Sequence, residues 1–180
     1  KLNTNNVYSK GMFENICLAI KVALDLGIDK KIIQKTLPLL SFEGRFQFLN
    51  KGRIKNMLHK NEIILIDGAH ATADAKNLAA YLKEIKIPKY GIWAMTKNKE
   101  PNLFIKQLKG VFKKVVTMPI ETEANSVSSK ELYKIAIKNK LKAEKSDSFT
   151  EALNIISNKE KKLIVCFGSL YNCGNILNKN

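Results

Sequence analysis

Short apolar runs alternate with longer amphipathic segments through most of the chain, and this alternation restricts the fold more than any other feature. The clearest runs are Leu163–Phe167 and Ile63–Ile66, in which every side chain is apolar. Uninterrupted apolar runs of this length are typical of strands covered on both faces, and helical segments between them are the connections that parallel strands require. The pattern predicts strands at residues 63–67, 90–95, 113–118, 141–144 and 163–167, with helices at 72–86, 102–108, 129–139 and 148–157.

Residues 44–180 are therefore expected to form an α/β domain, with a Rossmann-like, mostly parallel sheet and helices on both faces. At its beginning, residues 46–58 and 62–67 resemble two strands separated by charged and turn-forming residues. A change of composition near residue 43 marks the predicted domain boundary.

A different pattern precedes this domain. Apolar side chains recur with helical spacing over residues 7–27 and end at a glycine, a common helix terminator. Asp29 then begins a second short helix, which Pro38 stops. Residues 1–43 are expected to form a helical hairpin.

The net charge of +15 makes nucleic-acid binding a hypothesis to weigh. Of the 31 basic residues, however, only Arg45 and Arg53 are arginines, and the lysines are scattered along the whole chain. Phosphate and base recognition favours the bidentate arginine side chain, and no series of aromatic residues is interleaved with the basic ones. We expect a solvated, lysine-rich surface and no nucleic-acid partner.

The chain is also expected to be soluble and cytoplasmic, without a membrane partner. No apolar run approaches the roughly 18–20 residues that cross a bilayer, and residues 1–6 lack the apolar stretch of a signal peptide. The three cysteines form no C-x-x-C pair and only two histidines are present, so neither a disulfide framework nor a metal site is indicated.

Ligand sites of open α/β sheets lie beyond the carboxyl ends of the strands, so the residues after each apolar run are the first candidates. Asp67-Gly68-Ala69-His70 follows the run that begins at Ile63 and would place a carboxylate and an imidazole at this edge. Thr72 is expected to cap the next helix. The alternative is that Asp67 caps a loop and that His70 is a surface turn residue.

Two further strand ends carry polar residues, and the three strand ends are expected to lie side by side, so that His70, Lys99 and Ser169 gather at one edge of the sheet. Gly168-Ser169-Leu170-Tyr171 follows the last apolar run, where backbone N–H groups and the Ser169 hydroxyl could hold an anion, or Ser169 could simply cap a helix. In the segment Met95–Glu100, Lys97 or Lys99 could face a phosphate, or both could be solvated.

Several common motifs are missing from the sequence. It contains no G-x-x-x-x-G-K-[ST] phosphate loop, no G-x-G-x-x-G turn and no G-x-S-x-G elbow. The chain therefore lacks the usual cradle for ATP phosphates, and the other two absences argue against dehydrogenase and hydrolase functions.

Taken in order, the motifs resemble those of the folylpolyglutamate and dihydrofolate synthases of the Mur ligase superfamily, over nearly the whole chain. Gly44-Arg45-Phe46-Gln47 resembles the G-R-F-Q segment of the family, Asp67–His70 its D-G-A-H-N-P motif, and Gly168–Tyr171 its G-S-L-Y element. Asn98-Lys99-Glu100 resembles its D-K-D turn, and the helix containing Asn15 resembles one at the end of its central domain. The muramyl peptide ligases of the superfamily typically carry D-Y-A-H-N-P and lack G-S-L-Y.

The resemblance implies an organisation and an activity. Residues 1–43 would be a helical remnant of the central ATPase domain, and residues 44–180 the carboxy-terminal Mur ligase domain. The complete enzyme would use ATP and Mg²⁺ to phosphorylate the carboxylate of a folate or dihydropteroate, and the amine of glutamate would then attack the acyl phosphate. The partner that this chain requires would be an amino-terminal P-loop domain.

The resemblance also implies roles for individual residues. Asn15, Arg45 and Lys99 would bind the nucleotide. His70 would meet the terminal phosphate and the incoming glutamate, and Asp67 would lie towards the ribose and the interdomain hinge; these two are the expected catalytic residues. No metal ligand is expected in this chain.

Ser169, together with His70, is expected to bind the glutamate substrate. The sequence departs from the family at Ala71-Thr72, where Asn-Pro is usual, at Gly11-Met12, where His-Gln is usual, and at Asn98, where an aspartate is usual. Because the phosphate loop and the magnesium ligands would lie outside this chain, we expect no ligase activity from it alone. The alternatives are a stand-alone, lysine-rich nucleic-acid-binding module and a foldable remnant without function.

Overall fold

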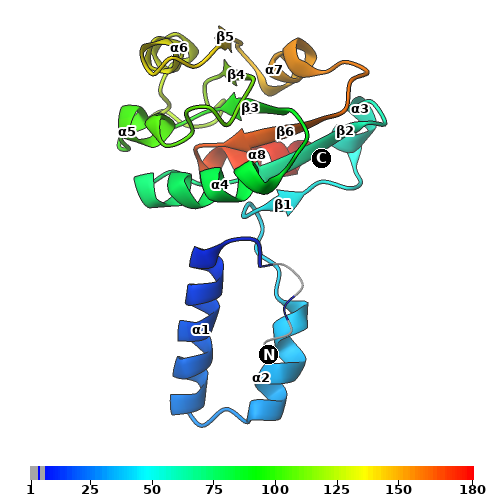
Figure 1. Cartoon of the computed structure of the whole chain (residues 1–180), viewed down its shortest axis with the longest axis vertical. Coiled ribbons are helices and arrows are strands. Elements are labelled where there is room, and N and C mark those ends of the chain that lie inside the picture. Colours follow the sequence, from blue (N-terminus) through cyan, green and yellow to red (C-terminus); the bar gives the residue numbers. More distant parts are fainter. Residues whose placement is uncertain (1–3, 5–6) are drawn as a thin grey trace. The chain divides into compact units, whose positions relative to one another are not determined.

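The computed structural model describes residue 4 and residues 7–180. Residues 1–3, 5 and 6 lie outside the described residues. They belong to residues 1–6, on which the expectation about a signal peptide was based. The chain divides into two compact units, Lys1–Glu43 and Gly44–Asn180 (Figure 1).

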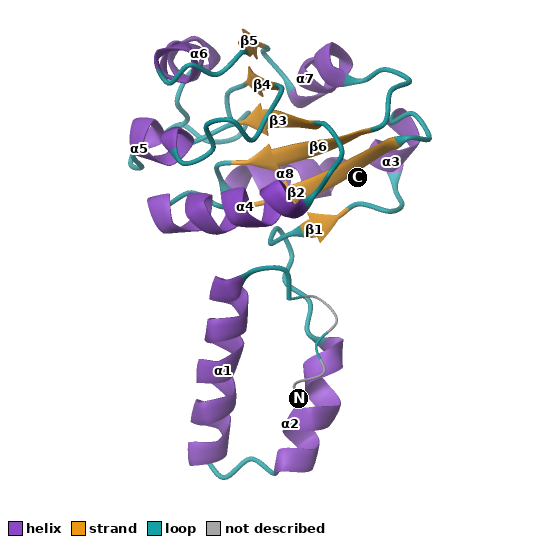
Figure 2. Cartoon of the chain, viewed as in Figure 1, coloured by secondary structure: helices purple, strands orange, loops and turns teal. Residues whose placement is uncertain are grey.

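The first unit is the predicted helical hairpin (Figure 2). Helix α1 spans Lys10–Asp25 and begins at Ser9, whose hydroxyl oxygen accepts a hydrogen bond from the Met12 N–H at 3.2 Å. Helix α2 spans Lys30–Thr36, and the Asp29 side chain caps it, as expected, by accepting from the Lys31 N–H at 2.6 Å. A single 3₁₀ turn, η1 (Leu37–Leu39), follows at Pro38.

The second unit is built on one six-stranded sheet in the order β1-β2-β6-β3-β4-β5. β1 is antiparallel to β2, and all other neighbours are parallel. This confirms the predicted mostly parallel α/β fold. The strands are β1 (Gln47–Phe48), β2 (Glu62–Asp67), β3 (Lys89–Trp93), β4 (Lys114–Thr117), β5 (Ala143–Lys145) and β6 (Lys162–Phe167).

Helices cover both faces of this sheet (Figure 2). When all crossovers are right-handed, the face on which a connecting helix lies depends on the direction in which the chain moves along the sheet. Helices of connections that move in opposite directions therefore lie on opposite faces. One face packs against α3, α7 and α8 through a cluster that includes Ile92, Ile164 and Leu153. On the other face, Phe104 of α5 stacks on Phe167 at a centroid distance of 6.0 Å. The helices are α3 (Arg53–Met57), α4 (Thr72–Glu84), α5 (Pro101–Lys106), α6 (Ser129–Lys138), α7 (Phe149–Ile156) and α8 (Leu170–Lys179).

The strand predicted for residues 46–58 is wrong over most of its length. Only Gln47 and Phe48 pair with β2, and Arg53–Met57 is the short helix α3. The reason lies at the other end of the chain. The backbone oxygen of Asn180 accepts from the Arg53 N–H at 2.8 Å, and its side-chain Oδ1 accepts from the Ile54 N–H at 3.0 Å. These bonds satisfy N–H groups at the start of α3.

The three strand ends singled out from the sequence are neighbours, as predicted. Asp67 pairs in register with Phe167, and Phe167 pairs with Trp93. β3 ends at Trp93, two residues before the predicted end at Met95. The carboxyl ends of β2, β6 and β3 therefore meet at one edge of the sheet.

Within the part of the chain that the structure describes, no helix combines the length and the apolar character that crossing a membrane requires.

Candidate functional site

The turns that follow β2 and β6 are in close contact with each other and with the turn that precedes β1. A side-chain carbon on Gly68 would lie 2.3 Å from Cδ2 of Leu170 and 3.3 Å from the carbonyl oxygen of Gly44. Glycine is therefore the residue that lets these turns approach. We call the residues at this edge of the sheet the rim: 44–47, 67–70, 94–99 and 168–171.

Asp67 ends β2 and is buried, with 2% of its surface exposed. Its Oδ2 accepts a hydrogen bond from the Phe46 N–H at 2.9 Å, and its Oδ1 accepts from the Ala69 N–H at 2.8 Å. Burial raises the pKa of the Asp67 carboxyl, whereas these two N–H groups and the guanidinium of Arg45 act in the opposite direction. Both carboxylate oxygens are thus engaged by the backbone of two different turns.

His70 is partly exposed just before α4. Its Nδ1 lies 2.7 Å from the carbonyl oxygen of Gly68. A carbonyl oxygen can only accept, so in this arrangement Nδ1 carries the proton. The bond orients the ring and leaves Nε2 as the nitrogen through which His70 can act on a ligand.

The prediction that Thr72 caps helix α4 is wrong. Ala71 occupies the N-cap position, and the carboxylate of Asp74 accepts from the N–H groups of His70 and Ala71 at 3.2 Å each. A carboxylate in the first turn of a helix accepts hydrogen bonds from N–H groups that have no partner within the helix, and the positive end of the helix dipole stabilises its charge. Asp74 therefore anchors the turn that carries His70.

Ser169 is the N-cap of α8 and is buried. Its Oγ accepts from the N–H groups of Tyr171 at 3.1 Å and Asn172 at 3.5 Å. The capping role that the sequence left open is thus present. The hydroxyl proton remains as the group that Ser169 could donate to a ligand.

Lys99 lies in a tight turn beyond β3. Its N–H donates to the Thr96 carbonyl oxygen at 3.3 Å, and the Thr96 hydroxyl donates to Oδ1 of Asn98 at 2.7 Å. Lys99 is half-buried, whereas Lys97 and Asn98 are exposed. The turn presents both lysines near the edge where the strands end.

Residues 125–127, which were not singled out from the sequence, support this turn. The Lys97 N–H donates to the Asn125 carbonyl oxygen at 2.7 Å, and the Val127 N–H donates to that of Met95 at 2.8 Å. Ser126 also forms an isolated antiparallel bridge with Thr96. The rule applied to the other strand ends would have found this segment, because it is the polar stretch that follows β4.

Arg45 is held in place by the residues on either side of it. The Gly44 carbonyl oxygen accepts from the Gly68 N–H at 2.6 Å, and the Phe46 N–H donates to Asp67. The backbone at Arg45 is therefore fixed to the turn that carries His70.

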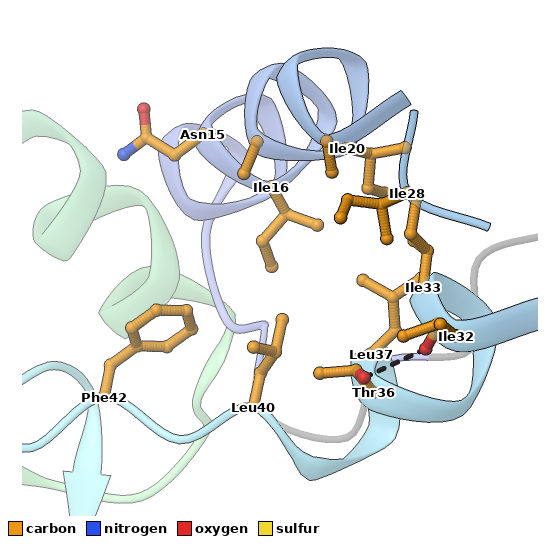
Figure 3. A pocket seen from close by; sticks show the side chains of 12 residues that line it. Asn15, Ile16, Ile20, Ile28, Ile32, Ile33, Thr36, Leu37, Leu40 and Phe42 are labelled. Carbon is orange, nitrogen blue, oxygen red and sulfur yellow. Dashed lines mark hydrogen bonds between the residues drawn. The ribbon is translucent and has the colours of Figure 1, made fainter. Parts of the chain in front are cut away.

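Asn15 belongs to the first unit, on the exposed side of α1. It lies at the border of a hollow of about 500 Å³ between α1 and α2. The other lining residues are almost all apolar, and the amide of Asn15 points away from them (Figure 3). The side chain can therefore contact a group outside the hairpin.

The rim has the chemistry of an anion-binding surface. Arg45 and Lys99 supply positive charge, and the amino-terminal ends of α4 and α8 begin at this edge. A metal site is a different matter, because no group of three histidine, cysteine, aspartate or glutamate side chains is placed to hold an ion among residues 4 and 7–180.

The fold and the rim together define a doubly wound α/β domain whose candidate site lies where its parallel strands end. Residues 50–179 match the protein family described as dihydrofolate synthetase, C-terminal domain. The chain belongs to this family. No curated protein matches the sequence.

Solved structures of folylpolyglutamate synthases share the fold. A Mycobacterium tuberculosis enzyme complexed with ADP is 18% identical, with a TM-score of 0.82, over 96% of this chain and 40% of that one. E. coli FolC in complex with DHPP and ADP is 17% identical, with a TM-score of 0.71, over 89% and 36%.

A third structure, the bifunctional folylpolyglutamate synthase/dihydrofolate synthase of Yersinia pestis complexed with AMPPNP and Mn ion, is 17% identical. Its TM-score is 0.72 over 89% of this chain and 37% of that one. The chain thus spans 40% or less of the length of these three proteins.

Proposed function

We propose that this chain is the carboxy-terminal part of an ATP-dependent ligase that joins glutamate to the carboxylate of a folate or dihydropteroate. The observation that carries the proposal is the meeting of three segments, Gly44–Gln47, Asp67–His70 and Gly168–Tyr171, at one edge of the sheet. Membership of the dihydrofolate synthetase family and the nucleotide complexes of the structural relatives support it.

The proposed reaction has two steps. An oxygen of the pteroate or folate carboxylate attacks the terminal phosphorus of ATP, the bond to the bridging oxygen breaks, and ADP leaves. The glutamate nitrogen then attacks the acyl carbon of the acyl phosphate, phosphate leaves, and the nitrogen loses a proton as the amide forms. Bound ATP and Mg²⁺ would supply the activated phosphoryl group and its charge neutralisation.

The residues of the rim fit the phosphate side of this chemistry. Arg45 and Lys99 are cations that would stabilise charge on the transferring phosphoryl group. His70 has two uses that its geometry allows. Because Nδ1–H is held by Gly68, a neutral His70 offers Nε2 as the acceptor for the amine proton, and a protonated His70 offers Nε2–H to a phosphate oxygen.

Two further residues have proposed binding roles. The Ser169 hydroxyl proton would donate to a carboxylate oxygen of glutamate, with its oxygen already committed to the start of α8. Asn15 would contribute its outward-pointing amide to the nucleotide base.

The metal and the phosphate loop must come from elsewhere in this proposal. The sequence has no phosphate-loop motif, and the described residues include no cluster of three metal-binding side chains. We therefore propose an amino-terminal P-loop portion as an obligatory partner, and no step of the reaction runs through a metal held by this chain.

The hairpin is the proposed attachment to that partner, as the last helices of its ATPase domain. Among the described residues of the first unit, only Ile16 and Leu37 are buried, whereas Ile32 on the wall of the hollow is 59% exposed. A two-helix unit of this kind leaves too much apolar surface in water to be stable by itself. An apolar face of the P-loop portion would fill the hollow.

Reconstitution tests the proposal. The chain mixed with its P-loop portion should release ADP only when ATP, Mg²⁺, a pteroate or folate and glutamate are all present. Neither part alone should do so. A soluble, folded and stably associated mixture that releases no glutamate-dependent ADP would refute the proposed function.

Association can be tested separately with a matched pair of variants. Ile32→Asp should weaken binding of the P-loop portion by about tenfold or more, because it places a charge in the apolar hollow. Ile137→Asp changes an exposed isoleucine on α6, outside the hairpin, and should leave binding unchanged. Equal affinities for the two variants would argue against the hairpin as the attachment.

A further inference from the structure

Asp67 is bound to the backbone through both of its carboxylate oxygens. It is buried, and each carboxylate oxygen accepts one backbone N–H, from Phe46 on one side and from Ala69 on the other. Hydrogen bonds between a carboxylate and backbone N–H groups are among the stronger ones in proteins. The carboxylate thus joins the turn before β1 to the turn after β2.

The first of these turns is strained. Phe46 has a φ of 44°, a left-handed conformation that is uncommon for an aromatic residue and costs on the order of 1–3 kcal/mol. Such a conformation persists only when its surroundings hold it. Here the holding contacts are the bond to Asp67, the edge-on packing of the Phe46 ring on Tyr81 at 5.0 Å, and the bond from Gly68 to Gly44.

The second turn carries His70. Ala69 donates to Asp67, the Gly68 carbonyl oxygen accepts the ring proton of His70, and Asp74 accepts from the His70 N–H. The bond between Ala69 and Asp67 therefore holds the backbone next to Gly68, whose carbonyl oxygen is bonded to the histidine ring.

We propose that Asp67 is a positioning residue: its two oxygens fix the turn that carries Arg45 and the turn that carries His70 relative to each other. It acts through these two residues. The significance of this positioning for catalysis rests on the proposed ligase function, whereas the geometry itself does not.

The electrostatics agree with this role. Burial raises the pKa of the Asp67 carboxyl, so the ionised group is retained at a cost in stability. Two N–H groups and the guanidinium of Arg45 offset part of that cost.

Amide exchange in the chain alone tests the geometry. Asp67→Ala should remove the protection of the Phe46 and Ala69 N–H groups from hydrogen exchange, and Asp67→Asn should remove it at one of the two, because an amide has a single oxygen. Asp147→Asn, an exposed aspartate, should change neither. Full protection of both groups in either Asp67 variant would overturn the proposal.

The tautomer of His70 separates positioning from simple support of the fold. In Asp67→Asn, nitrogen NMR of the His70 ring should show a larger share of the form protonated at Nε2, because the Gly68 carbonyl oxygen is no longer held in place. A ring spectrum identical to that of the unaltered chain, with the N–H protection lost, would show that Asp67 only supports the backbone.

Reconstituted enzyme gives the third measurement. Asp67→Asn should lower kcat by about 10–100-fold, as expected when reacting groups are misplaced by about 1 Å, and should change KM for ATP by less than about threefold. A raised KM with kcat unchanged would mean that Asp67 binds the nucleotide directly. If the unaltered mixture were inactive, the proposed function would fail while the exchange and ring measurements still decided this inference.

Discussion

Replacing Gly168 by alanine should be the most damaging single-methyl change at the rim. Gly168 has a φ of 108°, and a side-chain carbon there would lie 2.3 Å from the Ala94 carbonyl oxygen and 2.7 Å from Cδ1 of Trp93. Trp93 is fully buried, and the Ala94 oxygen is backbone, so neither can move aside cheaply. The substitution tests whether the ends of β6 and β3 are pressed together.

The expected loss combines two effects. A side chain at this φ costs roughly 1–3 kcal/mol, and forcing a methyl group into a packed site costs roughly 1–3 kcal/mol more. The sum, roughly 2–6 kcal/mol, is a large part of the 5–15 kcal/mol that stabilises a typical domain. Urea unfolding followed by circular dichroism should show a much lower midpoint.

Two matched glycines separate these effects. Gly110 has a φ of 76° and open space around it, so Gly110→Ala should show only the backbone cost, at the low end of roughly 1–3 kcal/mol. Gly174 lies within α8 with open space, so Gly174→Ala should stabilise the chain by about 0.5–1 kcal/mol. If Gly168→Ala were no worse than Gly110→Ala, the close contact with Ala94 and Trp93 would be refuted.

Three further outcomes are expected. The raised pKa of the Asp67 carboxyl means that the folded chain binds this proton more tightly than the unfolded chain does, so protonation of Asp67 stabilises the fold in acid, and this stabilisation is lost as the pH rises from the ordinary pKa of 3.8 through the raised one. Urea unfolding should therefore show that the difference in unfolding free energy between the unaltered chain and Asp67→Asn shrinks over that pH range. A difference that grows with pH would contradict the assignment. A colorimetric thiol reagent at neutral pH should modify Cys17 rapidly, and Cys166 and Cys173 only after unfolding, because both are buried and burial raises the pKa of Cys173 to about 12; more than one fast thiol in the native chain would be inconsistent with this. Lys162→Ala should cost about 3–5 kcal/mol in urea unfolding, since it leaves the buried Glu62 without its cation at 3.9 Å; a loss below about 1 kcal/mol would show that the other hydrogen bonds of Glu62 suffice.

The sequence predicts most of the fold because the strands are buried on both faces. Ile63–Ile66 and Leu163–Phe167 are apolar runs that pair with each other in the interior of the sheet, so local pattern and tertiary packing agree. The same reasoning correctly brings the ends of these strands together.

The errors occur where distant contacts decide the local structure. Residues 53–57 form a helix whose first N–H groups are bonded to Asn180, which is far away in the sequence. Thr72 is a good capping residue by type, but Asp74 reaches back to the N–H groups of His70 and Ala71 and anchors the start of the helix.

The positions of the candidate residues in the fold were predictable, but their contacts were not. Sequence reasoning selected Asp67, His70 and Ser169 from their positions after strands. It raised the helix-capping role of Ser169, which is a local contact, but it could not show that both oxygens of Asp67 are bound to backbone N–H groups. The bonds of Asp67 depend on the strained turn at Phe46 and on burial, which no local pattern encodes.

Binding-induced chemical-shift changes test the central claim most directly. The isotope-labelled chain, complexed with its unlabelled P-loop portion, would be compared with and without a non-hydrolysable Mg-ATP analogue and glutamate. The account predicts that the largest changes in backbone N–H shifts fall at the rim, in residues 44–47, 67–70, 94–99 and 168–171. Changes centred instead on the opposite ends of β2 and β6, around Glu62 and Lys162, would contradict it.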